Sequence, residues 1–201
     1  FRPFRLVRRI EETDDVVTLV LEPADGEPVA PSAPGQYVSV FVDLPNGRRQ
    51  GRQYTVSSTA LGTRVQITVR KVFGVDGAPV GEVSYFLHDC LKVGELVDVS
   101  ARAGDFVVTD ADSPLLLASA GAGITTVLPI LEHVAKTQPE RKVIVAHADR
   151  HAGHHALRDT VRHVGRLLDD FSSYIWYENV ADGDTRSFEG YMDLSAIDLP
   201  N

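Results

Sequence analysis

The sequence predicts a β barrel followed by an α/β part: a six-stranded antiparallel Greek-key barrel, then a parallel sheet covered by helices. The first observation is that residues 4–101 contain short runs in which apolar and polar residues alternate, separated by turn signals. The second is that apolar runs alternate with helical patterns after Pro114, which is typical of parallel strands joined by helical crossovers. The change lies near Asp110, so we expect domains at residues 1–109 and 110–201.

The barrel strands are indicated by six runs with a period of two: FRLVRR, VVTLVLEP, QYVSVFVDL, RQYTVSS, RVQITVRKV and ELVDVSA. Turn signals at residues 24–26, 45–47 and 61–63 separate consecutive runs. One helix is expected from about Ser84 to Leu91, because apolar residues recur there with helical spacing.

The α/β part contains three apolar runs that indicate parallel strands: LLLASA (residues 115–120), KVIVAHA and SYIWYENV. The segments TTVLPILEHVAK and LRDTVRHVGRLL lie between them and have the spacing of amphipathic helices. Parallel strands with such crossovers are covered on both faces, so we expect a buried sheet.

Composition narrows the classes of function. The net charge of −8 and the pI of about 5.3 argue against a nucleic-acid binder and favour small molecules or proteins as partners. The single cysteine, Cys90, excludes an internal disulfide and a four-thiolate iron–sulfur site within this chain. No apolar run approaches the roughly 20 residues that span a bilayer, and no signal segment is recognisable. We therefore expect a cytoplasmic protein without a membrane partner.

The run RQYTVSS combines a cation, a phenol and several hydroxyls on one strand. With a period of two, Arg52 and Tyr54 point one way while Gln53 and Thr55 point the other, so neither face is apolar and simple core burial is not expected. One interpretation is an exposed barrel strand. The other is a surface for a ligand with a planar ring and anionic groups, because tyrosine stacks and arginine binds phosphate.

A second candidate site follows the run LLLASA. Gly121-Ala122-Gly123 lies where a parallel strand leads into a helix, and glycines there let a phosphate approach backbone N–H groups. The segment lacks the third glycine of G-x-G-x-x-G, since Thr126 occupies that position. It therefore fits either a tight turn or a dinucleotide-phosphate loop.

Four segments resemble, in their order along the chain, the motifs of the ferredoxin–NADP reductase superfamily. They are Arg52-Gln53-Tyr54-Thr55, Gly81-Glu82-Val83-Ser84, Gly104-Asp105-Phe106 and the segment from Ser119 to Thr125. Their shared order is far more specific than any one of them. The resemblance implies an FAD-binding barrel followed by an NAD(P)-binding domain.

Further segments resemble the flavohaemoglobins over essentially all of the chain. They are Phe1 to Phe4, Pro34 to Tyr37, Tyr85 to His88, the pairs His147-Ala148 and His155-Ala156, and Gly190 to Leu194. This resemblance implies the reductase part of a nitric oxide dioxygenase, which passes electrons from NAD(P)H through FAD to a haem. That haem belongs to a globin domain that these residues do not contain.

The resemblance also implies roles for individual residues at the flavin. Arg52 would hold the FAD pyrophosphate, Tyr54 would lie against the flavin, and Thr55 would reach its N5 edge, which makes Tyr54 and Thr55 the catalytic candidates. Gln53 and Tyr37 would be further FAD contacts.

Backbone groups would bind the phosphates. The amides of Gly81, Val83 and Ser84 would meet the FAD pyrophosphate at a helix start. The dinucleotide loop would comprise Gly121, Ala122, Gly123, Ile124, Thr125 and Thr126. The family usually has proline where this chain has Thr126.

Two other functions stay open. The chain could be a reductase component that serves another oxygenase or a cytochrome, although the missing cysteine cluster disfavours the iron–sulfur variety. It could also be a non-enzymatic module that has lost its cofactors. The choice between NADH and NADPH is open as well, because Arg150 could meet a 2′-phosphate or face solvent.

Four histidines raise the question of a metal site. His147, His151, His154 and His155 could bind zinc or nickel if they shared a helix face. Because KVIVAHA indicates a strand that enters a loop, they should not share one, and we expect no metal site.

The C-terminal end is expected to be incomplete. Members of the family continue beyond the segment 191–194 with a strand ending in Cys-Gly-Pro and a final strand whose aromatic residue covers the flavin. Without them, the strand at residues 115–120 should form a sheet edge that invites association. We expect FAD binding to survive and hydride transfer to be slow.

Overall fold

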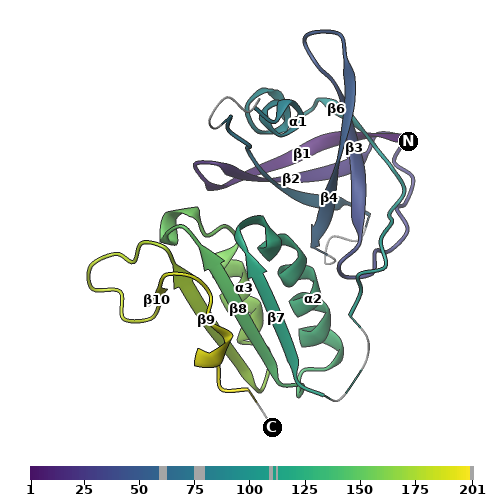
Figure 1. The fold of residues 1–201 in the computed structure, drawn as a ribbon. Coiled ribbons are helices and arrows are strands. Elements are labelled where there is room, and N and C mark those ends of the chain that lie inside the picture. The colour runs from purple at the N-terminus through teal and green to yellow at the C-terminus, as the bar shows by residue number, and fades with distance from the viewer. Residues whose placement is uncertain (59–62, 75–79, 109–110, 112, 200–201) are drawn as a thin grey trace. The chain divides into compact units, whose positions relative to one another are not determined.

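The computed structural model describes residues 1–58, 63–74, 80–108, 111 and 113–199. The chain divides into two compact units, Phe1–Val107 and Val108–Asn201 (Figure 1).

The first unit is a closed antiparallel barrel of six strands in the order β1-β2-β5-β4-β3-β6. Its strands are β1 (Arg2–Thr13), β2 (Val16–Pro23), β3 (Tyr37–Asp43), β4 (Arg49–Ser58), β5 (Val65–Arg70) and β6 (Leu96–Val99). The pairing of β1 with β6, with Phe4 opposite Val97, closes the barrel. All six predicted strands are confirmed.

The barrel core consists of the inward-facing side chains of these strands. Leu6, Leu19, Leu21 and Ile67 are each 0% exposed, and burial of such a side chain contributes roughly 1.5–3 kcal/mol. The register of β1 against β2 shifts after Leu6 and again near its end. Such bulges increase the local twist, which helps one long strand to pair with both β2 and β6.

The predicted helix is present, but it begins earlier and changes its winding. It starts as α1 (Glu82–Tyr85) and continues as a π-helical turn, η1 (Phe86–Cys90). Val83 and Leu87 anchor it in the barrel core.

The turns expected between strands are present where the structure describes them. The Gly26 amide donates to Pro23 O at 3.2 Å, and the Gly47 amide donates to Leu44 O at 2.9 Å. The third expected turn, at residues 61–63, lies mostly outside the described residues.

Burial along β4 differs from the sequence-based expectation. Arg52 and Gln53 are exposed, whereas Val56, Ser57 and Ser58 are buried. The Ser57 hydroxyl lies 2.9 Å from Thr68 Oγ1, so a hydrogen bond to β5 compensates for its burial. The expectation that this strand is not simply buried thus holds for its first half and is wrong for its second half.

The second unit is a sheet of four strands in the order β10-β9-β8-β7, all parallel. Its elements are β7 (Leu115–Ala120), α2 (Ile124–Thr137), β8 (Val143–Asp149), α3 (Arg158–Gly165), β9 (Phe171–Tyr177) and β10 (Phe188–Glu189). Strands β7, β8 and β9 and both helices confirm the prediction, whereas β10 was not predicted. Within the described residues, β7 pairs with β8 alone and forms an edge of the sheet.

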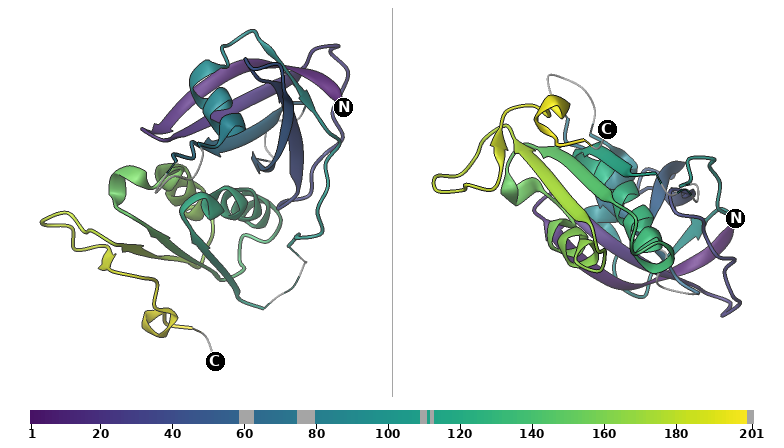
Figure 2. Two further views of the ribbon diagram at one scale, coloured as in Figure 1. Left: turned by 45° about the horizontal axis from the view of Figure 1, so that its top comes forward. Right: turned by 90° about the horizontal axis from the view of Figure 1, so that it is seen from below.

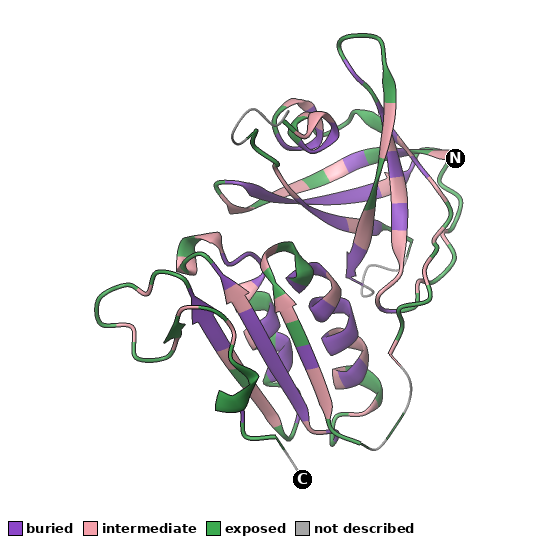
Figure 3. Cartoon of the chain, in the orientation of Figure 1, coloured by how far each residue is buried: buried purple, intermediate pink, exposed green. Residues whose placement is uncertain are grey.

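The two faces of this sheet are covered by different segments. Helices α2 and α3 lie on one face, and the C-terminal segment lies over the other (Figure 2). On that second face, Ile144 and Trp176 form a cluster with Ile197 and Met192. Strand β8 is accordingly buried along almost its whole length (Figure 3).

In the described part of the chain, none of the helices has the length and apolar character needed to cross a bilayer.

Candidate functional site

Strands β3 and β4 bring together the residues expected at the flavin. Tyr37 lies opposite Thr55, and Val38 lies opposite Tyr54. Cross-strand neighbours share a face, and Tyr54 accordingly packs against the barrel core while remaining half-buried. Its ring therefore rests against the core while part of the residue stays accessible.

Arg52 lies two residues before this tyrosine and is exposed. Its Nη1 donates to Gly51 O at 2.7 Å, and the described residues provide it with no carboxylate partner. Arg49 on the same strand differs, because it contacts Asp98 and lies 3.4 Å from an oxygen of Asp43. Arg52 therefore keeps guanidinium donors for an anionic ligand, while Arg49 is already engaged.

Burial raises the pKa of Tyr54 to about 12, and the nearby charge of Arg52 opposes this shift. The phenol therefore keeps its proton throughout the physiological range. A neutral phenol ring is suited to stack on another planar group and to donate a hydrogen bond.

Tyr37 and its strand are held by the segment that follows β6. The Tyr37 amide donates to Ala103 O at 2.9 Å, and the Ala103 amide donates back to Tyr37 O at 3.0 Å. A Cβ atom on Gly104 would lie 3.0 Å from Cδ1 of the Tyr37 ring, so the ring lies directly against this glycine.

The start of α1 forms a compact cradle around Gly81. Ser84 Oγ donates to Gly81 O at 2.9 Å and accepts from the Val72 amide at 3.2 Å. A Cβ atom at Gly81 would come within 2.6 Å of Ser84 Oγ and 2.8 Å of Val72 Cβ, so only glycine fits. The Gly81 amide itself donates to Val72 O at 3.0 Å. Of the three expected amides, those of Val83 and Ser84 therefore remain for a phosphate, since first-turn amides lack intrahelical acceptors.

In the second unit, the loop from Gly121 to Gly123 forms a 3-10 turn between β7 and α2. Ala122 and Gly123 are exposed, whereas Ile124 and Thr125 are buried and anchor the start of the helix. Thr125 Oγ1 donates to Ala122 O at 2.9 Å. A Cβ atom at Gly123 would lie 3.2 Å from Cβ of Ser119, so a small side chain there would require Ser119 to shift by a few tenths of an ångström.

Thr126 occupies the first turn of α2 and is half-buried. All six residues of the expected dinucleotide loop are thus contiguous at the carboxyl end of β7. This is where open parallel sheets bind ligands, and the amino end of α2 adds a partial positive charge.

The structure also reveals a buried polar network at the carboxyl ends of β7, β8 and β9 that the sequence analysis did not identify. Ser119 Oγ lies 2.9 Å from Nδ1 of His147, which is 0% exposed. The ring centroids of His147 and His155 are 4.2 Å apart. His155 Nδ1 in turn lies 2.9 Å from the Tyr177 hydroxyl.

Burial, together with the neighbouring His147, lowers the pKa of His155 to about 3. His155 is therefore neutral at physiological pH. The two His-Ala pairs were the available signal, but their mutual contact depends on a loop conformation that spacing alone does not define.

The four histidines do not share a helix face, as expected: His147 is on β8, and the other three lie in or beside a 3-10 turn, η3 (Ala152–His154). Among the described residues, no group of three or more His, Cys, Asp or Glu side chains is arranged to hold a metal ion.

Comparison with known proteins gives a family for the barrel unit. The model of the oxidoreductase FAD-binding domain matches residues 3–108, which include all six barrel strands. The chain belongs to this family. Within the FAD-binding family, the exposed Arg52 and the half-buried Tyr54 lie on the strand that the resemblance assigns to the flavin.

Similarity to known proteins extends beyond the barrel to nearly the whole chain. A flavohemoprotein of Pseudomonas putida is 39% identical and matches 99% of this chain, but only 49% of its own length. The chain thus spans about half the length of the curated relatives it matches.

Two solved structures share this fold. The FAD/NAD-binding domain of nitric oxide dioxygenase from Vibrio cholerae has a TM-score of 0.90 and 32% identity, covering 99% of this chain and 82% of its own. A flavohemoglobin from Malassezia yamatoensis, with bound FAD and heme, has a TM-score of 0.85 and 31% identity, covering 99% and 50%. The predicted family and fold class are confirmed.

Proposed function

We propose that this chain is an FAD-dependent NAD(P)H oxidoreductase that passes electrons to a haem, as the reductase part of a nitric oxide dioxygenase. The observation that carries the proposal is the pair formed by exposed Arg52 and half-buried Tyr54 on one strand of an FAD-binding barrel. The similarity to flavohemoproteins along nearly the whole chain supports the same conclusion. The haem would belong to a globin domain.

The residues present fit FAD chemically. Arg52 offers guanidinium donors for the pyrophosphate, and the amides of Val83 and Ser84 supply two more. Tyr54 offers a neutral ring for stacking, and Thr55 supplies a hydroxyl beside it. Gln53 and Tyr37 lie with Thr55 on the strand face opposite Arg52 and Tyr54, and we propose them as further contacts.

Bound FAD would supply the redox chemistry, because a flavin accepts a hydride from NAD(P)H and can release electrons singly. The chain's own residues would orient the two rings and exclude water from them. The loop from Gly121 to Thr126 would bind the dinucleotide phosphates through the exposed amides of Ala122 and Gly123. We place this activity in the cytoplasm, where an unpaired thiol such as Cys90 stays reduced.

The visible absorption spectrum of the purified chain tests this proposal. We expect a flavin spectrum that bleaches when NADH or NADPH is added anaerobically and returns when oxidised flavohaemoglobin globin domain is added. A colourless protein that takes up no FAD would indicate a module without cofactors. A flavin that reduces a cytochrome but not the globin domain would favour a reductase for a different acceptor.

A further inference from the structure

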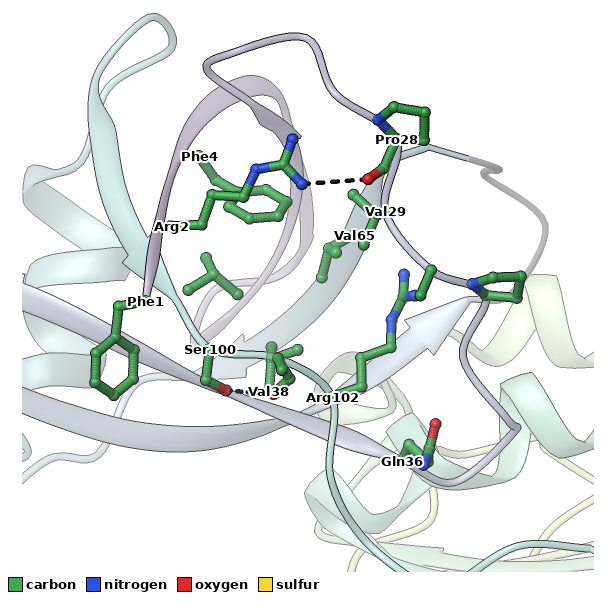
Figure 4. A pocket seen from close by; sticks show the side chains of 14 residues that line it. Phe1, Arg2, Phe4, Pro28, Val29, Gln36, Val38, Val65, Ser100 and Arg102 are labelled. Atoms are coloured by element: carbon green, nitrogen blue, oxygen red, sulfur yellow. Dashed lines mark hydrogen bonds between the residues drawn. The ribbon is translucent and has the colours of Figure 1, made fainter.

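The barrel unit contains a cavity of about 510 Å³ on the side formed by β1, β3 and β6 (Figure 4). Much of its wall is apolar and includes Phe4, Val29, Val38, Val65 and Val99. Cavities of this size with mostly apolar walls and few polar groups are typical of small-molecule sites. None of the residues assigned above to FAD or NAD(P)H lines this cavity.

Arg102 supplies a cation to this wall. Its Nε and Nη1 atoms are buried, and neither has a hydrogen-bond partner among the described residues. Burial lowers the pKa of the guanidinium from its ordinary value. Burying donors of a charged group without partners is costly, so such an arrangement is expected where a ligand completes it.

The backbone fixes Arg102 at this position. The Ser100 amide on one side donates to Ser39 O at 2.9 Å, and Ala103 on the other exchanges two hydrogen bonds with Tyr37. Movement of the guanidinium away from the cavity would have to come from its side chain alone.

The other polar groups of the cavity are already engaged. Arg2 binds both carboxylate oxygens of Asp25 and donates to the carbonyl oxygens of Glu27 at 2.6 Å and Pro28 at 3.2 Å. Gln36 Oε1 accepts from the Ala33 amide at 2.9 Å. The positive charge of Arg2 is therefore neutralised, and that of Arg102 is left without a counterion among the described residues.

We propose that this cavity binds a small amphipathic carboxylate, with its apolar body against Phe4, Val29 and Val65 and its carboxylate on Arg102. A planar guanidinium matches the geometry of a carboxylate. A single uncompensated cation balances one negative charge, whereas a phosphate dianion would remain partly unneutralised. The apolar wall gives a hydrocarbon chain or ring a surface that a free inorganic anion would not use.

Octanoate is the probe for this site, and octan-1-ol is its neutral counterpart of the same length. Calorimetric titration of the FAD-loaded chain should give saturable binding of octanoate. Arg102→Met keeps much of the side-chain length and removes the charge, so octanoate should bind about ten- to a hundredfold more weakly. Binding of octan-1-ol should be unchanged or tighter.

Two further variants test whether octanoate binds in this cavity. Arg5→Met removes an equal charge from an exposed residue of β1 outside the cavity and should leave octanoate binding unchanged. Val29→Trp should fill the cavity and abolish binding of both probes. Far-ultraviolet circular dichroism and flavin absorbance check that each variant folds.

Equal octanoate binding by the parent and Arg102→Met would overturn the role of Arg102. Absence of any saturable octanoate binding to the parent would overturn the site itself. Neither result depends on electron transfer, because flavin reduction by NADH is measured separately on the same samples.

Discussion

The Ser119 hydroxyl lies 2.9 Å from Nδ1 of the buried His147, and this contact joins β7 to β8 directly before the loop at Gly121. The contact adds a side-chain hydrogen bond to the backbone ladder between the two strands. Cβ of Ser119 is also the atom that a side chain at Gly123 would meet first. Ser119 therefore influences the geometry of the loop both through its hydrogen bond to His147 and through its proximity to Gly123.

Gly123→Val should block access of the dinucleotide while FAD stays bound. A branched side chain would crowd Ser119 and fill the space that a phosphate needs beside the exposed turn. Stopped-flow absorbance should show flavin reduction by NADH slowed at least tenfold, with flavin content unchanged.

Thr137→Val is the control for this variant, because it places the same branched side chain at the far end of α2. It should reduce flavin at the parent rate. Parent-like reduction by Gly123→Val would show that the loop does not bind the dinucleotide.

Arg52→Ala should weaken FAD binding by about 1.5 to 3 kcal/mol, the contribution of a charge-assisted hydrogen bond. The purified variant should be paler than the parent, and equilibrium dialysis against FAD would measure the difference. Arg49→Ala removes a charge from the same strand, yet its guanidinium already contacts Asp98. It should retain parent flavin content. Equal FAD affinity in the parent and Arg52→Ala would contradict the assignment.

The buried His155 should make the second unit less stable in mild acid. Its folded pKa, about 3, lies below the ordinary histidine value of 6.5, so between these values the unfolded chain binds more protons than the folded one. The free energy of unfolding should therefore fall with decreasing pH, by up to about 1.4 kcal/mol per pH unit from this group.

Urea unfolding between pH 7.5 and 4.5 measures this dependence. The chain's single tryptophan, Trp176, is buried in the second unit and reports on it by fluorescence. His155→Asn removes the titrating group and should flatten the curve by that amount. The same pH dependence in both proteins would place the acid sensitivity elsewhere.

The edge strand β7 should promote association at high concentration. Ala118 is exposed in the middle of this strand, and a lysine on an edge opposes pairing with another chain. Light scattering behind a sizing column should show oligomers of the parent that decrease in Ala118→Lys. A parent that stays monomeric at high concentration would refute this prediction.

The fold could be predicted from the sequence because burial follows local periodicity. Valine recurs at every second position along YVSVFVD, and β3 follows this period of two, because Val38, Val40 and Val42 are buried while the residues between them are only half-buried. Local periodicity fails to predict the burial of hydroxyl residues. Ser57 and Thr68 are buried together, because a hydrogen bond of 2.9 Å between their hydroxyl oxygens compensates for the burial of both. This contact depends on the register between two strands, which the sequence alone does not reveal.

The candidate sites likewise combine features that local sequence predicts with contacts that it does not. The exposure of Arg52 agrees with a strand that has no apolar face, and the contacts of these residues with cofactors stay predictions. The hydrogen bond from the Gly81 amide to Val72 depends on how remote segments meet. So does the burial of Nε and Nη1 of Arg102 without a partner among the described residues. Such contacts have no local signature, so the sequence could not have indicated them.

The closure of the barrel by β1 and β6 has a consequence for how the chain folds. Phe4 must find Val97, across nearly the whole unit, whereas in the second unit β7 pairs with β8 and β8 with β9, each the next strand along. Joining distant segments costs more chain entropy and slows folding. During synthesis, β1 can pair with β2 early, but closure of the barrel has to wait until β6 has left the ribosome, while each strand of the second unit can pair once its crossover helix and the next strand are made. The barrel unit, although it is translated first, therefore completes its sheet after a longer delay than the second unit does.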